Sequence, residues 1–243
     1  MHIIEIYKSI QGESSFAGLP CVFVRLAGCN LRCSWCDSEY TFTGGRKVSE
    51  DEIVAEVQRL SPPSIGAPHM PLSADVGPGG GLVEITGGEP LLQERELVPL
   101  LRRLLALGYE LLLETSGERP LEQVPAAVHK IVDVKCPGSG EHLRFRAENL
   151  SALTSRDELK FVLASQEDYE YARDVIRTRN LESGPASIIL SPAFRKDAGG
   201  ARSAEHCLLD PRELAEWMLA DGLRARLGLQ IHKFIWEPQQ KGV

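Results

Sequence analysis

Short apolar runs alternate along most of the chain with stretches whose apolar residues recur at helical spacing. The apolar runs predict strands at 21–27, 82–86, 109–114, 130–135, 158–163, 187–190 and 227–231. The helical spacing predicts helices at 49–60, 92–107, 166–179 and 210–219, with start signals at Ser49–Glu52 and Asp210–Pro211. This alternation is typical of a parallel sheet built from βα units, so we expect an α/β fold.

The number of units separates two α/β architectures. Six or seven units fit an incomplete (β/α)6-type TIM barrel better than the full eight-unit barrel, which takes about 250 residues. An open doubly wound sheet is the alternative. A chain of 243 residues can bury one sizeable core, and we predict a single domain over 1–243. Within it, 61–81 and 192–206 are expected to be irregular loop insertions.

Composition narrows the class of protein. A hydrophobic content of 43% with 25% charged residues is typical of globular proteins, and a net charge of −7 argues against binding to a nucleic-acid backbone. The first residues lack the pattern of a secretory signal, and the longest apolar stretch, 97–113, is interrupted by Arg102 and Arg103. We therefore expect a cytoplasmic protein without a membrane or nucleic-acid partner.

Three of the six cysteines follow the first predicted strand with the spacing C-x3-C-x2-C, at Cys29, Cys33 and Cys36. In a reducing compartment, clustered cysteines are metal ligands or redox groups more often than disulfides. Three thiolates are one fewer than a structural zinc site or an ordinary iron–sulfur cluster uses. A [4Fe–4S] cluster held this way keeps one iron open to another ligand. The alternatives are a buried stripe on a helix and a zinc site completed by a distant histidine.

Polar clusters follow four successive predicted strands, at 28–29, 86–90, 114–117 and 133–135. The carboxyl ends of strands carry the active sites of barrels and of open α/β sheets. In Thr-Gly-Gly-Glu-Pro, at 86–90, two glycines allow backbone to approach a ligand, and Glu89 can accept from an ammonium group. The alternative is a plain strand-to-helix turn closed by Pro90.

The cysteine spacing followed by Gly-Gly-Glu-Pro resembles the radical S-adenosylmethionine (SAM) superfamily. The resemblance implies that the three cysteines hold a [4Fe–4S] cluster whose open iron binds the methionine part of SAM. It also implies that one electron, from a donor such as flavodoxin, cleaves SAM to a 5′-deoxyadenosyl radical that abstracts hydrogen from a substrate.

Further segments narrow the resemblance: 9–13, Arg25, 36–38, 114–117, 133–137 and 230–233. Together they resemble the 7-carboxy-7-deazaguanine synthases, lyases that convert 6-carboxy-5,6,7,8-tetrahydropterin to 7-carboxy-7-deazaguanine with loss of ammonia. That reaction lies on the route to queuosine, a tRNA modification, and to other 7-deazapurines. The family resemblance implies Mg²⁺ and a homodimer. A glycyl-radical activase and a zinc-stabilised interaction domain are the competing hypotheses.

The family motifs imply a set of contacts for each ligand. For the pterin they are Ile10, Gln11, Gly12, Glu13, Arg25, Thr86, His232 and Pro238. For SAM they are Trp35, Cys36, Asp37, Gly88, Glu89, Ser116 and Lys135.

The chemistry of these side chains suits the implied substrate. Arg25 can bind the pterin carboxylate through two parallel hydrogen bonds, and Gln11 and Glu13 can form hydrogen bonds with the donors and acceptors at the edge of the ring. His232 and Glu13 are the catalytic candidates, His232 as a proton donor in the loss of ammonia. The alternatives are a Glu13–Arg25 ion pair, a structural His232 and Trp35 as core packing.

Ser38 departs from the family pattern, which has Thr at this position as a ligand of Mg²⁺. Serine keeps the hydroxyl oxygen, so we still expect Mg²⁺ here, although the lost methyl group loosens χ1. Ser38 as a turn cap is the alternative. The residues 239–243 after Pro238 put in doubt any role that depends on a terminal carboxylate.

Overall fold

A computed structural model of the chain describes residues 1–62, 81–196, 204–237 and 240–242. The strands are β1 (His2–Ile10), β2 (Pro20–Leu26), β3 (Arg46–Lys47), β4 (Leu82–Gly87), β5 (Glu110–Thr115), β6 (His129–Asp133), β7 (Glu158–Leu163), β8 (Ser187–Pro192) and β9 (Arg226–Leu227). The α-helices are α1 (Glu50–Leu60), α2 (Glu94–Ala106), α3 (Gln166–Thr178), α4 (Pro211–Asp221) and α5 (His232–Ile235). None of the helices in the described part of the chain is both long and apolar enough to cross a membrane.

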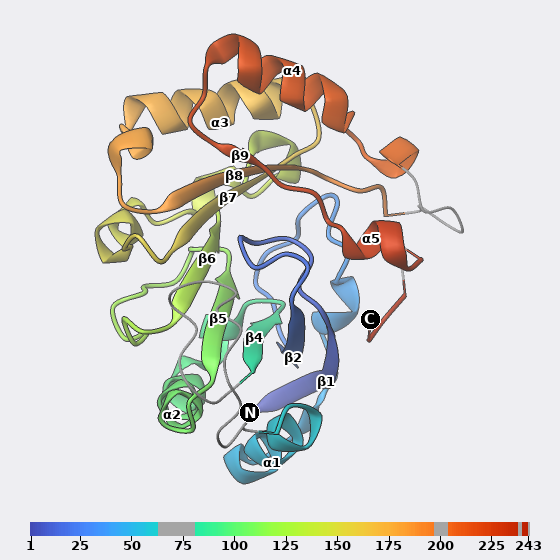
Figure 1. Ribbon diagram of the computed structural model, residues 1–243, viewed down its shortest axis with the longest axis vertical. Coiled ribbons are helices and arrows are strands. Elements are labelled where there is room, and N and C mark those ends of the chain that lie inside the picture. The colour runs from blue at the N-terminus through green and yellow to red at the C-terminus, as the bar shows by residue number, and fades with distance from the viewer. Residues whose placement is uncertain (63–80, 197–203, 238–239, 243) are drawn as a thin grey trace.

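The order of the strands decides between the two predicted architectures. All strands join one sheet in the order β3-β1-β2-β4-β5-β6-β7-β8-β9, and the pairs from β2 to β9 are parallel. A doubly wound sheet reverses its strand order at a switch point, and this one does not. Figure 1 shows the sheet as an arc, with α1 and α2 outside one half and α3 and α4 outside the other. The expectation of an incomplete barrel is confirmed.

Three parts of the sheet differ from the prediction. β1 was not predicted, and it pairs with β2 in the antiparallel direction, with the short β3 beyond it. The strand predicted at 227–231 is wrong after Leu227, because the chain leaves the sheet there and the Ile231 amide donates to the Gly12 carbonyl at 3.0 Å. The connections from β5 to β6 and from β6 to β7 contain no α-helix, so the βα alternation is interrupted there, and 3₁₀ turns lie between β6 and β7.

The four predicted helices are present with small shifts of their ends. Ser49 and Glu52 form the predicted capping box of α1, and the Asp210 side chain caps α4 ahead of Pro211. Of the two predicted loop insertions, residues 63–80 and 197–203 lie outside the described residues.

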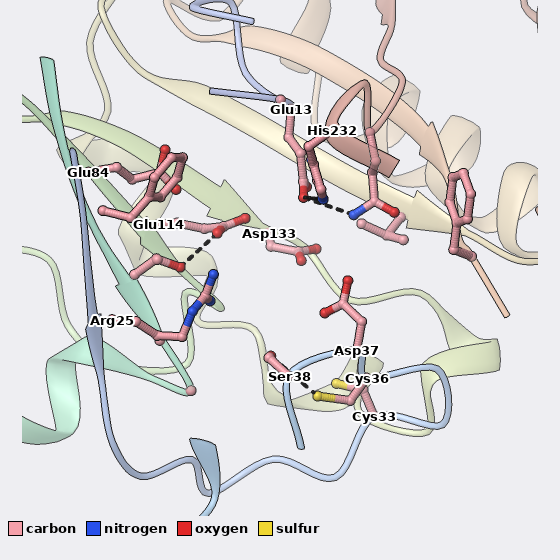
Figure 2. Close-up of a pocket in the computed structure, with 18 of the residues that line it drawn as sticks. Glu13, Arg25, Cys33, Cys36, Asp37, Ser38, Glu84, Glu114, Asp133 and His232 are labelled. Atoms are coloured by element: carbon pink, nitrogen blue, oxygen red, sulfur yellow. Dashed lines mark hydrogen bonds and ion pairs between the residues drawn. The ribbon is translucent and has the colours of Figure 1, made fainter. Parts of the chain in front are cut away.

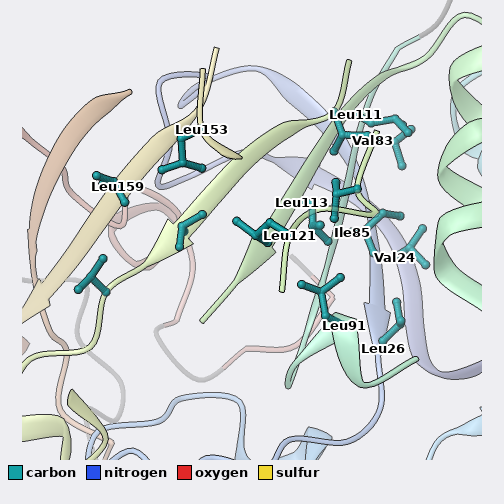
Figure 3. Close-up of a cluster of buried hydrophobic side chains, with 14 of the residues drawn as sticks. Val24, Leu26, Val83, Ile85, Leu91, Leu111, Leu113, Leu121, Leu153 and Leu159 are labelled. Atoms are coloured by element: carbon teal, nitrogen blue, oxygen red, sulfur yellow. The ribbon is translucent and has the colours of Figure 1, made fainter. Parts of the chain in front are cut away.

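Successive side chains of each strand point to opposite faces of the sheet, so the strands contribute to two buried layers, one outside and one inside the arc. Outward-facing residues such as Val24, Ile85 and Leu113 belong to the large core between sheet and helices (Figure 3). The inward faces of β2 to β6 begin with a smaller apolar cluster, which consists of Cys21, Phe23, Leu82, Leu112 and Ile131. The same alternation directs charged residues of β2 and β4 to β7 into the interior of the arc: Arg25, Glu84, Glu114, Asp133 and Lys160.

Candidate active site

A cavity inside the arc brings together most of the residues predicted for the site. Its walls include Ile10, Gln11, Gly12, Glu13, Arg25, Cys29, Cys33, Trp35, Cys36, Asp37, Ser38, Thr86, Gly88, Ser116, Lys135 and His232. Figure 2 shows Arg25 across the cavity from Cys33 and Cys36, with Glu13 and His232 side by side on a third wall. Pro238 lies outside the described residues. Trp35 is half-buried on the wall and belongs to neither apolar cluster, so core packing does not explain it.

The cysteine loop follows β2 without forming a helix, so the interpretation as a buried helical stripe is wrong. The Cys36 amide donates to the Cys33 carbonyl at 3.2 Å, and the Leu31 amide donates to the Cys29 sulfur at 3.4 Å. Burial raises the pKa of the Cys33 thiol to about 11 and also raises that of Cys29. Metal binding therefore has to displace protons from these thiols.

The donor set fits a cluster better than a single ion. Within the described ranges, no three His, Cys, Asp or Glu side chains are arranged to hold one metal ion, whereas structural zinc needs four converging ligands. A [4Fe–4S] cluster binds each thiolate through a different iron, so its ligands are spread along a loop. Three half-buried thiols on one loop that faces a cavity meet this requirement.

Ser38 presents its hydroxyl group beside the cluster loop. It precedes the 3₁₀ turn Glu39–Thr41, but its side chain makes no capping hydrogen bond, so the interpretation as a turn cap is wrong. Its Oγ lies 3.6 Å from the Cys36 sulfur, on the cavity wall. The preceding Asp37 forms an ion pair with the buried Lys233 from α5. A hydroxyl oxygen at this position suits a hard cation such as Mg²⁺.

The Gly-Gly-Glu-Pro turn packs directly on the cysteine loop. A Cβ atom on Gly88 would lie 2.2 Å from the Gly28 carbonyl oxygen and 2.7 Å from Cys29 Cβ. Gly87 adopts a φ of +151°, and a Cβ there would lie 2.3 Å from the Leu26 carbonyl oxygen. Glycine is required at both positions because backbone atoms of Leu26, at the end of β2, and of Gly28, just after it, occupy the space that a side chain would need.

Glu89 supports this turn from behind the cavity wall. It is fully buried, and its carboxylate accepts hydrogen bonds from Thr115 Oγ1 at 2.8 Å and from the Ser116 amide and hydroxyl at 2.9 and 2.6 Å. It also accepts from the Leu91 amide at 3.0 Å. Glu89 thus holds Ser116 on the wall, and its predicted contact with SAM stays a prediction.

Arg25 is fixed at one edge of its guanidinium group. Its Nε donates to Glu5 at 3.0 Å and its Nη2 donates to the Tyr7 hydroxyl at 3.0 Å, while Tyr40 also donates to Glu5 at 2.9 Å. The alternative of a Glu13–Arg25 ion pair is therefore wrong. Burial opposes the charge of Arg25, but Tyr7, Tyr40 and Glu5 raise its pKa overall. Nη1 makes no hydrogen bond to a described residue, which leaves a donor edge for an anion.

Glu13 is the centre of the third wall. It forms an ion pair with Lys160 at 2.9 Å, accepts from Gln230 at 2.8 Å and lies 3.9 Å from His232 Nε2. Burial alone would raise the pKa of Glu13, but Lys160, His232 and Lys233 lower it overall. Burial also lowers the pKa of His232, so this ring is neutral at neutral pH and is not a standing cation.

Gln11 and Glu84 form a buried pair that the sequence analysis did not assign. Gln11 Nε2 donates to Glu84 at 3.0 Å, while Gln11 Oε1 accepts from the amides of Glu13 and Ser14 at 2.8 and 3.0 Å. Burial, with Glu114 nearby, raises the pKa of Glu84 to about 8. Glu84 is therefore a neutral carboxylic acid at neutral pH, and it can donate a hydrogen bond into the cavity.

Replacing Glu84 by glutamine is expected to flatten the dependence of stability on pH. A pKa raised in the folded state stabilises the fold at low pH, and this contribution is lost as pH rises from the unfolded value of 4.5 to about 8. Within that window the free energy of unfolding should fall by about 1.4 kcal/mol per pH unit in the wild type because of this group. Urea unfolding of the two proteins across the window measures the difference.

Glu158 provides a control of opposite sign. Burial opposes its charge, but hydrogen bonds from His129 and Ser15 lower its pKa overall. Glu158→Gln should lower stability at neutral pH and leave the loss of stability toward pH 8 in place. Equal slopes for wild type and Glu84→Gln would contradict the assignment of a neutral Glu84.

Five charged or polar residues of the cavity were not predicted as site residues, although the sequence contains some indication of them. Glu84 is the single charge of the mostly apolar strand β4, and Lys160 lies with Glu158 in the mostly apolar strand β7; both Glu84 and Lys160 are buried. Asp133, Gln230 and Lys233 lie in segments that carried the family resemblance, but no role followed for them from the motifs alone. All five line the cavity.

Comparison with known proteins agrees with this geometry. Residues 24–136 match the family model of the radical SAM superfamily. A curated 7-carboxy-7-deazaguanine synthase from Koribacter versatilis is 63% identical over 243 residues, which cover both chains completely. One from Chlorobaculum tepidum is 40% identical, over 100% of this chain and 97% of its own.

A solved structure is similar in fold. The crystal structure of QueE from Escherichia coli superimposes with a TM-score of 0.64 at 23% identity, over 94% of this chain and 93% of that one. Since the sequence relatives match over the full length, the chain belongs to the 7-carboxy-7-deazaguanine synthase family of the radical SAM superfamily.

Proposed function

We propose that this protein converts 6-carboxy-5,6,7,8-tetrahydropterin to 7-carboxy-7-deazaguanine with loss of ammonia, on the route to queuosine and other 7-deazapurines. The observation that carries this proposal is the identity of 63% with a 7-carboxy-7-deazaguanine synthase over the whole of both chains. The cavity supports it, because a cysteine loop and an anion-binding arginine line the same space (Figure 2).

The cysteine side of the cavity is suited to the cofactors of the family. Cys29, Cys33 and Cys36 would hold the [4Fe–4S] cluster, and Ser38 would provide an oxygen to Mg²⁺. When bound, the cluster and SAM supply the radical that abstracts hydrogen from the substrate. SAM would lie along Trp35, Cys36, Asp37, Gly88, Ser116 and Lys135.

The opposite side is suited to a carboxylated pterin. Arg25, fixed by Glu5 and Tyr7, would offer its free edge to the substrate carboxylate. Ile10, Gly12 and Thr86 would border the ring, and Glu13 would accept from its N–H groups.

His232 would take part in the proton transfers that release ammonia. A neutral imidazole within 3.9 Å of the Glu13 carboxylate can accept a proton and pass it on. We propose no separate role for Pro238 beyond the substrate contact implied by the family motif.

The remaining features are proposals of the same kind. The reaction needs a one-electron donor, such as flavodoxin, and we propose a homodimer that acts in the cytoplasm on a small molecule. We further propose that the chain acts as one radical SAM domain over 1–243.

Anaerobic reconstitution of the protein with iron and sulfide tests the proposed function directly. We expect a brown protein that, with a reductant, SAM and Mg²⁺, converts the carboxytetrahydropterin to the deazapurine and releases ammonia. Product formation is followed by chromatography and mass spectrometry, with reactions lacking SAM or the pterin as controls. No turnover by protein with a fully loaded cluster would refute the proposal.

A further inference from the structure

A buried lysine joins two walls of the cavity. Lys160, on β7, is 2% exposed, and its ammonium group forms ion pairs with Glu13 at 2.9 Å and with Glu114. Glu13 lies in the loop after β1, whereas Glu114 lies on β5, and both line the cavity. One cation therefore connects two carboxylates that belong to different parts of the fold.

The second oxygen of each carboxylate is also held. Glu13 Oε1 accepts from Gln230 at 2.8 Å, and Glu114 Oε2 accepts from the Thr86 hydroxyl at 2.9 Å. With both oxygens bonded, neither carboxylate can rotate freely. Both remain able to accept a further hydrogen bond, because a carboxylate has about four lone-pair sites.

The charges around Glu13 and Glu114 explain why a cation is needed between these two carboxylates. Glu13 faces Lys160, His232, Lys233 and Asp37, and Lys160 also lies near Asp133. Glu114 is close enough to Glu84 to raise its pKa. Burial opposes the charge of Lys160, but Glu114 and Glu13 raise its pKa overall. Without this cation, a half-buried acidic cluster would have to take up protons or move apart.

We propose that Lys160 is a positioning residue that holds Glu13 and Glu114 as paired acceptors on the cavity wall, spaced to bind the N–H groups of the pterin ring. This inference rests on the proposed function, because it takes the pterin as the ligand. A ligand rich in N–H donors gains from two fixed anionic acceptors, since charge-assisted hydrogen bonds are stronger than neutral ones. Lys160 itself contacts the carboxylates and acts on the substrate through them.

Lys160→Met and Lys130→Met form a matched pair of variants. Lys130, on β6, is also 2% exposed and pairs with Asp157 at 3.0 Å, but it does not line the cavity. In Lys160→Met, kcat/KM for the pterin should fall by about 30-fold or more, as for other truncated buried charge pairs. The KM for SAM and the iron content should stay unchanged. Lys130→Met should lower stability and leave the KM for the pterin unchanged.

The pH profile gives a second readout that a merely structural role would not change. Without Lys160, burial of Glu13 is less compensated and its pKa should rise, although Lys233 still lowers it, so the acid limb of kcat/KM for the pterin should move to higher pH. Lys160→Arg, which keeps the charge, should restore part of the rate and reverse this shift. An unchanged KM and pH profile in Lys160→Met would overturn the inference.

Two further measurements keep the test decisive. If Lys160→Met does not fold, the double variant Lys160→Met/Glu114→Gln removes one uncompensated carboxylate and should still show the shifted acid limb. If the wild type does not turn over the pterin, the proposed function fails. Infrared titration of the substrate-free protein then tests only whether Lys160 holds Glu13 and Glu114 in their charged form. The absence of a new protonated-carboxyl band in Lys160→Met would overturn that part of the inference.

Discussion

Replacing Cys33 by alanine is expected to abolish both the [4Fe–4S] cluster and all turnover. Three thiolates are already one fewer than an ordinary four-cysteine cluster uses, and the loop contains no thiol besides Cys29, Cys33 and Cys36. Two remaining thiols, Cys29 and Cys36, cannot hold three irons in place. Iron and sulfide content, visible absorption after anaerobic reconstitution and product formation measure the loss.

Cys21→Ala is the matched control for this experiment. Cys21 is 1% exposed in the small apolar cluster inside the arc, and it does not line the cavity. This variant should lose some stability through the small cavity that it creates, and it should keep its cluster and activity. A brown, active Cys33→Ala protein would contradict the three-cysteine assignment.

The barrel could be predicted from the sequence because its strands are encoded locally. β4, β5 and β7 are short, mostly apolar runs between turn signals, and the predicted helix between β4 and β5 fits their parallel pairing. The antiparallel β1 was missed although its residues alternate. The early end of β9 was also missed, because it depends on contacts made further along the chain, such as that of the Ile231 amide with Gly12.

The site could be predicted where its residues lie at strand ends, and it could not where long-range packing decides their roles. The cysteine loop and the glycine turn are recognisable as motifs. In contrast, Glu89 is directed to Ser116 by the parallel arrangement of β4 and β5. Lys160 pairs with Glu13 across 147 positions of the chain. No local pattern contains such a pair, although a buried charge in a mostly apolar strand indicates that a partner exists.

Gly88→Ala is expected to lower kcat/KM for SAM by about 100-fold or more, since a misplacement of about 1 Å can have this effect. The new methyl group would lie 2.2 Å from the Gly28 carbonyl oxygen and 2.7 Å from Cys29 Cβ. Both neighbours belong to the loop that carries the cysteines, and neither is the flexible end of a side chain. The turn and the cysteine loop must therefore move apart. Steady-state kinetics with varied SAM, and SAM binding by calorimetry, measure the effect.

Gly222→Ala separates this steric effect from the general cost of replacing a glycine. Gly222 ends α4 with a φ of +61° and has no atom within 4 Å of its Cβ position, so alanine strains the backbone without a clash. It should lower the free energy of unfolding by about 1 kcal/mol and leave the kinetics with SAM unchanged. Equal activity in Gly88→Ala and Gly222→Ala would mean that SAM does not depend on the close packing of the two loops. A specific loss in Gly88→Ala, with the cluster retained, would instead assign SAM to the space where the glycine turn meets the cysteine loop.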